Sequence, residues 1–538
     1  MEKNNLWVKI WRKLVLPFEQ FLPLFFLFFL LSTAAEFGYS IMQHDFKIAV
    51  LHAAHGILLS YLLSLIVGLF SNKAVRMATA IVFLVILTIV FFTDIVCILE
   101  FNSDFSGDFI SIVLGTDPSE SSEFLRTHFA GFVWGLLLTA VFFFLYFLGK
   151  RFGLSIAHKW TALPLVVVLL SLVTLNLKPQ ARERILVEKS SEGKVYAFFH
   201  YVHSIPPDYS IYRKPAELDV VDRQPDNIVV IFGESHCRTH SQFNGYDKVT
   251  MPEIQGMIDN GSITVFDQVT SPGVNTVESF KSMMSTYRPE YGDSVMFYTC
   301  QTLPQVIRDA GYHSTWISNQ SQYGMFDNVI GHFAALCDTT IFIGDRFSGN
   351  VRKNLDGELL PYVESAVAHA DGVKNFYAIH LMGSHPNFQE RYPESFTFFT
   401  PEEYSDRIES QRQNFAYYDN SIRYTDYVVS QIIRVFEDKE AIILYLSDHG
   451  LDFYFTRDDY FAHGVATFPP SVEPASEVPC FVYTSEAYKM DFPDLCVRMK
   501  EHTGDPYRMD NLLYTLMDMA GVQFKDPAEN GPSLFGKR

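Results

Sequence analysis

Four residues that can bind a metal ion or act as a nucleophile lie at the ends of two apolar runs and in one turn. Glu234 directly follows the apolar run 227–233, and Asp448-His449 follow the run 441–447. Carboxylate oxygens and imidazole nitrogens are ligands that zinc accepts at about 2 Å. Thr276 supplies a hydroxyl that a nearby metal ion would activate. Together the four predict a zinc centre that carries its own nucleophile.

The two apolar runs are the elements that must position these side chains. Both are short and rich in β-branched residues, which is typical of buried strands in a parallel sheet. In such sheets, ligands bind where strands end and loops begin. Further strands are predicted at 263–266, 314–317, 376–381 and 478–483, and helices at 276–285, 303–310, 357–369, 417–436 and 510–520. This alternation predicts an α/β domain over 227–538.

The position of Thr276 has two interpretations. Pro272 and Gly273 form a turn before a helical pattern, so Thr276 falls at the N-cap or in the first turn. There the unpaired N–H groups and the helix dipole favour an alkoxide and a bound phosphate. The alternative is that Thr276 only caps the helix. Glu234 alone also has an alternative as a capping carboxylate, whereas Asp448-His449 at a bend is the stronger metal signal.

Two histidines in glycine-flanked loops extend the predicted site. His385 follows the strand predicted at 376–381, and His463 lies beyond His449 in Ala-His-Gly. Such imidazoles are predicted to bind phosphate oxygens, transfer a proton to a leaving group, or hold a second metal. Because the chain contains 17 histidines, a structural role is the alternative for either one.

The first third of the chain has the pattern of a membrane domain, predicted over 1–177. Five apolar stretches, each near the ~20 residues that cross a bilayer, lie at 15–35, 49–70, 77–99, 129–148 and 160–175. The first is not a cleaved signal peptide, because further spans follow it. Lys and Arg concentrate before the first span and in alternate loops, which predicts a cytoplasmic N-terminus and an exported C-terminal domain.

The net charge, the linker and the cysteines give three further indications about this protein. A net charge of −19 argues against nucleic acid as a partner. The linker 178–226 contains an amphipathic pattern over 181–203, which predicts a helix on the membrane surface or a linker helix packed on the domain. Cys97 falls in a span; Cys300 and Cys337 could form a disulfide in an oxidising compartment, and the sequence leaves that pairing open.

Several motifs carry a resemblance to a known family. They are Gly-Glu-Ser at 233–235, Phe-Asn-Gly-Tyr at 243–246, the segment 269–276, Gly-Ser-His at 383–385, Tyr-Asp-Asn-Ser-Ile at 418–422 with Thr425-Asp426, and Ser-Asp-His-Gly at 447–450. With them the chain resembles the bacterial phosphoethanolamine transferases of the alkaline-phosphatase and sulfatase superfamily, over nearly its whole length. The resemblance implies a five-helix transmembrane domain followed by an α/β alkaline-phosphatase/sulfatase-like domain.

The resemblance also implies an activity. Zinc-dependent transfer of phosphoethanolamine would run from phosphatidylethanolamine, through a phosphothreonine, to an envelope glycan or lipid such as lipopolysaccharide core or lipid A. It implies a monomer in the bacterial inner membrane with a periplasmic catalytic domain. The implied residues are Glu234, Thr276, Asp448 and His449 for zinc, Thr276 as nucleophile, His385 and His463 for phosphate, and Thr116 and Glu120 for the lipid donor.

Departures from the family pattern leave the acceptor open. Pro272 and Lys281 stand where lipid A-modifying members have cysteines, Ser235 replaces a threonine, and Ile112 replaces an asparagine. The segment 316–320 resembles the branch that modifies lipopolysaccharide core sugars. The alternatives are a phosphoglycerol transferase, which the Asn-Gly-Tyr and Tyr-Asp-Asn-Ser motifs disfavour, and a non-catalytic envelope scaffold. A sulfatase activity is disfavoured because the chain lacks the Cys-x-Pro-x-Arg setting.

Overall fold

The structure is a computed structural model, and it forms two compact units. It describes residues 6–101, 105, 129–176, 190–204, 215–295, 297–320, 329–343, 354–370, 374–455, 461–462 and 473–536. Thr116, Glu120 and His463, predicted above as site residues, lie outside these ranges. The N-terminal unit comprises Met1–Val113 and Phe124–Ile205, and the C-terminal unit comprises Leu114–Glu123 and Pro206–Arg538.

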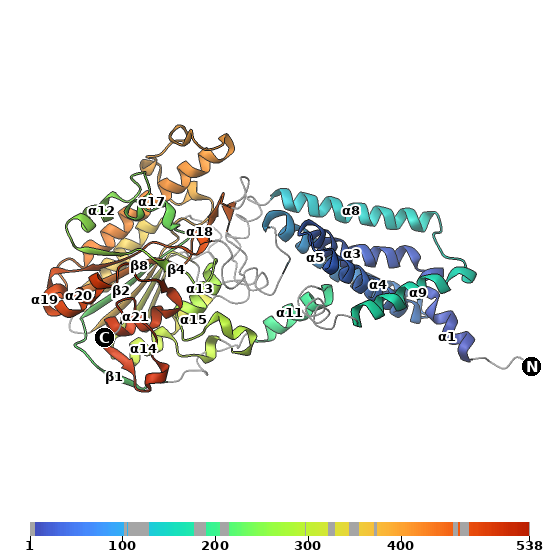
Figure 1. Cartoon of the computed structure of the whole chain (residues 1–538), viewed down its shortest axis with the longest axis horizontal. Helices are drawn as coiled ribbons and strands as arrows, with labels where there is room; N and C mark the ends of the chain where they lie inside the picture. The colour runs from blue at the N-terminus through green and yellow to red at the C-terminus, as the bar shows by residue number, and fades with distance from the viewer. Residues whose placement is uncertain are drawn as a thin grey trace, which may run out of the picture. The chain divides into compact units, whose positions relative to one another are not determined.

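Among its described residues, the N-terminal unit contains five helices long and apolar enough to cross a membrane (Figure 1). They are α3 (Leu22–Met42), α4 (Phe46–Leu69), α5 (Lys73–Phe101), α8 (Phe129–Arg151) and the stretch His158–Leu175, which includes α9 (Ala162–Asn176). The prediction of five such helices is confirmed.

The first long helix begins later than predicted. The span was expected from residue 15, but α1 (Leu6–Leu14) and α2 (Leu16–Glu19) are separate short helices, and α3 begins at Leu22. Gln20 and Phe21 separate α2 from α3, and Pro23 occupies the first turn of α3. Proline is favoured there because its missing N–H would have no helical partner.

A buried group of charges joins helix α11 (Ser191–Ser204) to the long helices. Lys194 of α11 donates to Asp94 Oδ1 of α5 at 2.5 Å and to Glu36 of α3, and its side chain is 1% exposed. Nearby, Glu192 Oε1 lies 2.6 Å from His55 Nε2 of α4. Burial lowers the pKa of Lys194, but Asp94 and Glu36 outweigh it and raise the pKa above its ordinary value. Lys194, expected on the polar face of an amphipathic helix, is therefore buried, since two carboxylates among apolar helices need a cation.

The C-terminal unit is built on a seven-stranded sheet with the order β3-β11-β8-β2-β7-β5-β6. The strands are β2 (Asn227–Gly233), β3 (Ile263–Phe266), β5 (His313–Ser318), β6 (Thr339–Phe342), β7 (Asn375–His380), β8 (Ala441–Ser447) and β11 (Cys480–Thr484). Strands β2 and β8 pair in parallel at the centre, as predicted. Strand β11 runs antiparallel to both neighbours, which the sequence pattern did not indicate.

Helices cover both faces of this sheet and enclose two apolar cores (Figure 1). One face carries α12 (Pro252–Asp259), α16 (Leu360–Ala368) and α17 (Glu409–Val435). The other carries α13 (Thr276–Met283), α14 (Leu303–Asp309), α15 (Val329–Ala335), α20 (Pro493–Glu501) and α21 (Leu512–Met519). Apolar side chains on both faces hold the central strands rigidly, so residues at their ends have fixed positions.

Short elements complete the C-terminal unit. They are β1 (Leu218–Val220) with β13 (Val522–Phe524), β4 (Val269–Thr270) with β12 (Tyr507–Arg508), β9 (Asp452–Phe453) with β10 (Phe461–Ala462), α18 (Glu473–Ser476) and α19 (Glu486–Asp491). None of the six cysteines forms a disulfide, so the bridge considered between Cys300 and Cys337 is not present.

Candidate metal centre

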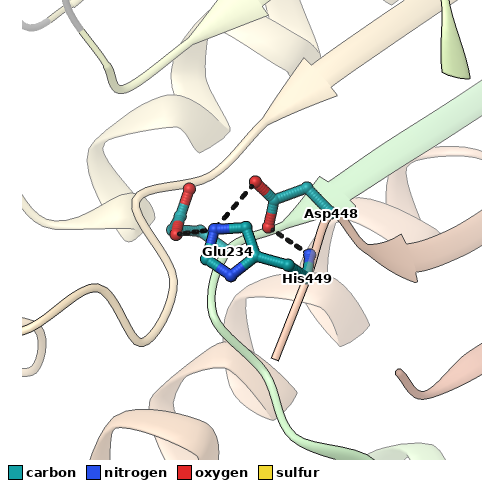
Figure 2. Close-up of side chains that lie close together, drawn as sticks. All are labelled: Glu234, Asp448 and His449. Carbon is teal, nitrogen blue, oxygen red and sulfur yellow. Dashed lines mark hydrogen bonds and ion pairs between the residues drawn. The ribbon is translucent and has the colours of Figure 1, made fainter. Parts of the chain in front are cut away.

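The register of the two central strands brings an acid from each to the same place. Gly233 at the end of β2 pairs with Ser447 at the end of β8, so Glu234 and Asp448 leave the sheet side by side. Ser235 then has a φ of 57°, a left-handed conformation that is costly for a residue with a side chain. Figure 2 shows the side chains of Glu234, Asp448 and His449 directed toward one another. Each is at most 1% exposed.

The distances among these three side chains suit a small cation. His449 Nε2 lies 3.3 Å from Glu234 Oε1 and 3.4 Å from Asp448 Oδ2. One ligand atom from each of the three lies within 4.8 Å of the others. Asp448 Oδ2 is buried and accepts no hydrogen bond from the described part of the chain. A carboxylate oxygen in that state, beside a second carboxylate and an imidazole, fits the donor set that zinc takes.

Electrostatics in the protein without metal keep protons on this site. Burial and the charge of Glu234 raise the pKa of Asp448 to about 8, against a smaller opposing effect from His449. Burial lowers the pKa of His449, but Asp448 and Glu234 outweigh it and raise that pKa to about 9. The raised pKa values favour protonated Asp448 and His449 at neutral pH, and a bound cation would take the place of those protons.

Thr276 begins helix α13 and contacts this group. The N-cap is Asn275, whose side chain accepts from Glu278 N at 3.0 Å, so the interpretation of Thr276 as the helix cap is wrong. The Thr276 hydroxyl donates to Glu234 Oε2 at 3.0 Å and lies 3.3 Å from His449 Nε2. The structure therefore brings together the four side chains from which the sequence predicted a zinc centre.

A glycine turn after β7 packs against Glu234. Gly383 has a φ of 51°, and Ser384 N donates to the backbone oxygen of Glu234 at 2.9 Å. Asp356 fixes the turn by accepting from Met382 N and Gly383 N, both at 2.8 Å. His385 follows the turn, and its Nδ1 lies 3.4 Å from the guanidinium of Arg391.

Two residues that hold Glu234 were missed by the sequence reasoning. Gln320 Nε2 donates to Glu234 Oε2 at 3.1 Å and to Leu381 O at 3.3 Å. The Ser235 hydroxyl donates to Glu234 Oε1 at 2.5 Å. Gln320 stands just beyond a predicted strand, as Glu234 does, so the strand-end signal was available for it. With these donors and Thr276, both oxygens of Glu234 are held in fixed positions.

Comparison with known proteins identifies the family. The sulfatase family profile matches residues 226–522. The chain belongs to the sulfatase family. Within this family it is similar to the phosphoethanolamine transferase EptC of Escherichia coli K12, with 24% identity over 314 residues that cover 57% of this chain and 52% of that protein. The chain spans about half the length of the curated relatives it matches.

Solved structures of the family share its fold. The integral membrane lipooligosaccharide phosphoethanolamine transferase EptA of Neisseria meningitidis superposes with a TM-score of 0.66 at 19% identity, covering 94% of this chain and 96% of that one. The periplasmic domain of E. coli EptC in complex with Zn gives a TM-score of 0.52 at 23% identity, covering 60% and 90%. The predicted fold class, five apolar helices followed by a sulfatase-like α/β domain, is confirmed.

Proposed function

We propose that this protein transfers phosphoethanolamine from phosphatidylethanolamine to an envelope glycan or lipid through a phosphothreonine at position 276. The observation that carries the proposal is the Thr276 hydroxyl, 3.0 Å from Glu234 Oε2 and 3.3 Å from His449 Nε2, at the start of a helix. The names of its relatives EptC and EptA support the headgroup. The acceptor proposed is lipopolysaccharide core or lipid A.

Zinc is the cofactor in this proposal, held by Glu234, Asp448, His449 and Thr276. The nitrogen and oxygen atoms of Glu234, Asp448 and His449 are buried and suit it, and the related E. coli domain forms a complex with Zn. When bound, zinc would favour the ionised threonine hydroxyl and offset negative charge on the phosphoryl oxygens. Gln320 and Ser235 orient Glu234 by donating one hydrogen bond to each of its oxygens.

The proposed reaction has two displacements at phosphorus. In the first, Thr276 Oγ1 bonds to phosphorus, its proton leaves along the hydrogen bond to Glu234, and the bond from phosphorus to the diacylglycerol oxygen breaks. His385 and His463 are proposed to bind the phosphate and to supply the proton that diacylglycerol takes. In the second, an acceptor oxygen gives its proton to the histidine that lost one and bonds to phosphorus, while the bond to Thr276 breaks and Thr276 Oγ1 takes back the proton from Glu234. Unpaired N–H groups at the start of α13 stabilise the phosphoryl oxygens.

The five apolar helices support a lipid donor and a location in the membrane for this protein. Five apolar helices on the same chain would keep the enzyme where its insoluble donor is. We place it in the bacterial inner membrane with a cytoplasmic N-terminus and a periplasmic C-terminal unit, since Lys and Arg collect on one set of loops. Thr116 and Glu120 are proposed to contact the lipid donor, and the protein is proposed to act as a monomer.

The test uses the full-length protein in detergent with zinc and two labelled donors. Phosphatidylethanolamine should release diacylglycerol and add one phosphoethanolamine to the protein, while phosphatidylglycerol should do neither. Thr276→Ala should abolish both signals because the attacking oxygen is removed. Thr503→Ala, a change to a partly exposed threonine outside the site, is the matched control and should react normally. Normal labelling of Thr276→Ala, or preference for phosphatidylglycerol, would refute the proposal.

A further inference from the structure

A cleft of about 580 Å³ shares two loops with the metal centre. One wall comes from the segment that follows Glu234, including His240, Asn244 and Tyr246, and the other from the segment that follows His449, including Phe453 and Phe455. The volume is in the range of about 300–1,000 Å³ typical of small-ligand sites. We refer to this feature as the Asn244 cleft. Because its walls continue the loops that carry the metal ligands, a molecule bound there would be held next to the reacting groups.

Tyr418 of α17 connects the cleft with the metal centre. Its hydroxyl donates to Ser235 O at 2.7 Å and accepts from Cys237 N at 2.8 Å, so it fixes the chain directly after Glu234. The ring of Tyr418 packs edge-on against His240 of the cleft, with centroids 4.9 Å apart. Tyr418 therefore contacts both the chain directly after Glu234 and one wall of the cleft.

The wall that carries Asn244 is held rigidly by one buried carboxylate. Asp419, which is fully buried, accepts from His240 Nδ1 at 2.7 Å, from the Tyr246 hydroxyl at 2.7 Å and from the Tyr404 hydroxyl at 2.5 Å. His240 and Tyr246 flank Asn244 in the chain, so these bonds set the position of the segment between them. A cleft with a fixed wall loses little conformational entropy when a ligand binds.

The side chain of Asn244, which lines the cleft, has polar atoms without hydrogen-bond partners among the described residues. Both its side-chain oxygen and its side-chain nitrogen are buried, and neither has a hydrogen-bond partner among the described residues. Leaving such a group unpaired is unfavourable, because it has lost its hydrogen bonds to water. A ligand that both donates and accepts in one small region would satisfy both atoms, and neighbouring hydroxyl groups have that property.

The rest of the cleft suits a sugar ring. Phe455 is 67% exposed and Tyr454 partly so, which offers aromatic faces on which the C–H face of a sugar ring packs. Arg407 also lines the cleft, with its guanidinium 4.7 Å from the centroid of the Phe415 ring. Asp247 lines the cleft as well, and Arg407 pairs with Asp406 at 3.5 Å, so the lining offers both an acceptor and a donor for the hydroxyl groups of a sugar.

We infer that the Asn244 cleft binds a sugar residue of the glycan acceptor, with Asn244 hydrogen-bonded to its hydroxyls and Phe455 packed on its ring. This rests on the proposed transfer reaction and names the class of acceptor, a hydroxyl-rich glycan. The donor lipid would not use the cleft. Changes there should consequently affect the second displacement and leave the first unchanged.

The test separates the two half-reactions in the full-length protein in detergent. Delipidated lipopolysaccharide core oligosaccharide is the acceptor probe, and labelled phosphatidylethanolamine is the donor. Asn244→Ala and Phe455→Ala should each raise the KM for the oligosaccharide at least about tenfold. Both should keep the wild-type burst of diacylglycerol release measured without acceptor. Phe398→Ala removes another exposed aromatic side chain, 52% exposed and outside the cleft, and should change neither quantity.

Each alternative result has a clear meaning. An unchanged KM in both cleft variants overturns the inference, as does an equal loss of the donor burst, which would make the cleft part of the donor site. Failure of wild type to release diacylglycerol refutes the proposed function instead. Saturation-transfer NMR with the oligosaccharide then still tests the cleft, since binding should be lost in Asn244→Ala. Asn244→Asp, which keeps the shape and one acceptor oxygen, serves if the alanine variant does not fold.

Discussion

Replacing Gly383 by alanine should damage the metal centre through backbone contact alone. An added Cβ would lie 2.8 Å from both the backbone nitrogen and the backbone oxygen of Glu234, and 3.1 Å from its Cβ. These atoms belong to the chain at the end of β2, which the sheet on both sides prevents from moving. The φ of 51° adds a second cost, because side chains disfavour the left-handed region.

The magnitude follows from the two costs together. Left-handed backbone costs about 1–2 kcal/mol for a residue with a Cβ, and forced overpacking costs about 1–3 kcal/mol. Gly383→Ala should therefore destabilise the C-terminal unit by about 2–5 kcal/mol. Gly261 is the matched control, since it has a φ of 78° but nothing within 4 Å of the added Cβ. Gly261→Ala should cost only about 1–2 kcal/mol.

Thermal unfolding of the full-length protein in detergent, read with its zinc content after dialysis, measures both effects. A domain of this size loses roughly 2 °C of Tm per kcal/mol, so Gly383→Ala should lower the Tm of the C-terminal unit by about 4–10 °C. It should also lose zinc, because Glu234 must shift, whereas Gly261→Ala should keep it. Equal Tm shifts and full zinc content in both variants would show that the turn does not position Glu234.

Four further predictions follow from the described contacts. The pKa values of Asp448 and His449 are raised to about 8 and 9, so zinc binding at pH 7 should release about two protons. Calorimetry in buffers of different ionisation enthalpy measures this number. Release of no protons would contradict the prediction. The metal-free protein then holds more protons folded than unfolded, so its stability should fall as pH rises from about 4 to 9. Lys194→Met should destabilise the N-terminal unit by about 3–5 kcal/mol, because two buried carboxylates lose their cation; a Tm equal to wild type in detergent would refute this. Asp356→Asn should lower the retention of zinc on dialysis. The Asp356 oxygens accept from Met382 N and Gly383 N, and the substitution replaces one of these oxygens with an NH₂ donor. Unchanged retention would show that these hydrogen bonds are dispensable.

The centre of the site was predictable because its residues lie at the ends of recognisable strands. Glu234 and Asp448 follow buried runs that pair in register, so a local pattern and one rule of sheet topology suffice to bring them together. Thr276 was predicted with two roles open, and the hydrogen bond that Glu278 N donates to Asn275 excludes the capping role. The role of Thr276 as nucleophile is a proposal.

The remaining contacts depend on tertiary structure that a local pattern does not contain. Asp356 lies 26 residues before Met382, whose N–H it accepts, and no periodicity relates the two. Lys194 looked like a solvent-facing charge because its two partners are 100 and 158 residues away. The antiparallel direction of β11 is invisible in its own residues, since a buried strand has the same composition in either direction.

The pairing of Lys194 with Glu36 and Asp94 has a consequence for biosynthesis. Ribosomes make the chain from the N-terminus, so the two acids enter the bilayer long before the lysine is translated, 158 and 100 residues later. Until then each acid must stay protonated or near water, because an unpaired charge is costly in hydrocarbon. A nascent chain stopped before position 194 thus lacks the cation that pairs with Glu36 and Asp94, and the helix bundle gains that cation only when α11 has been made.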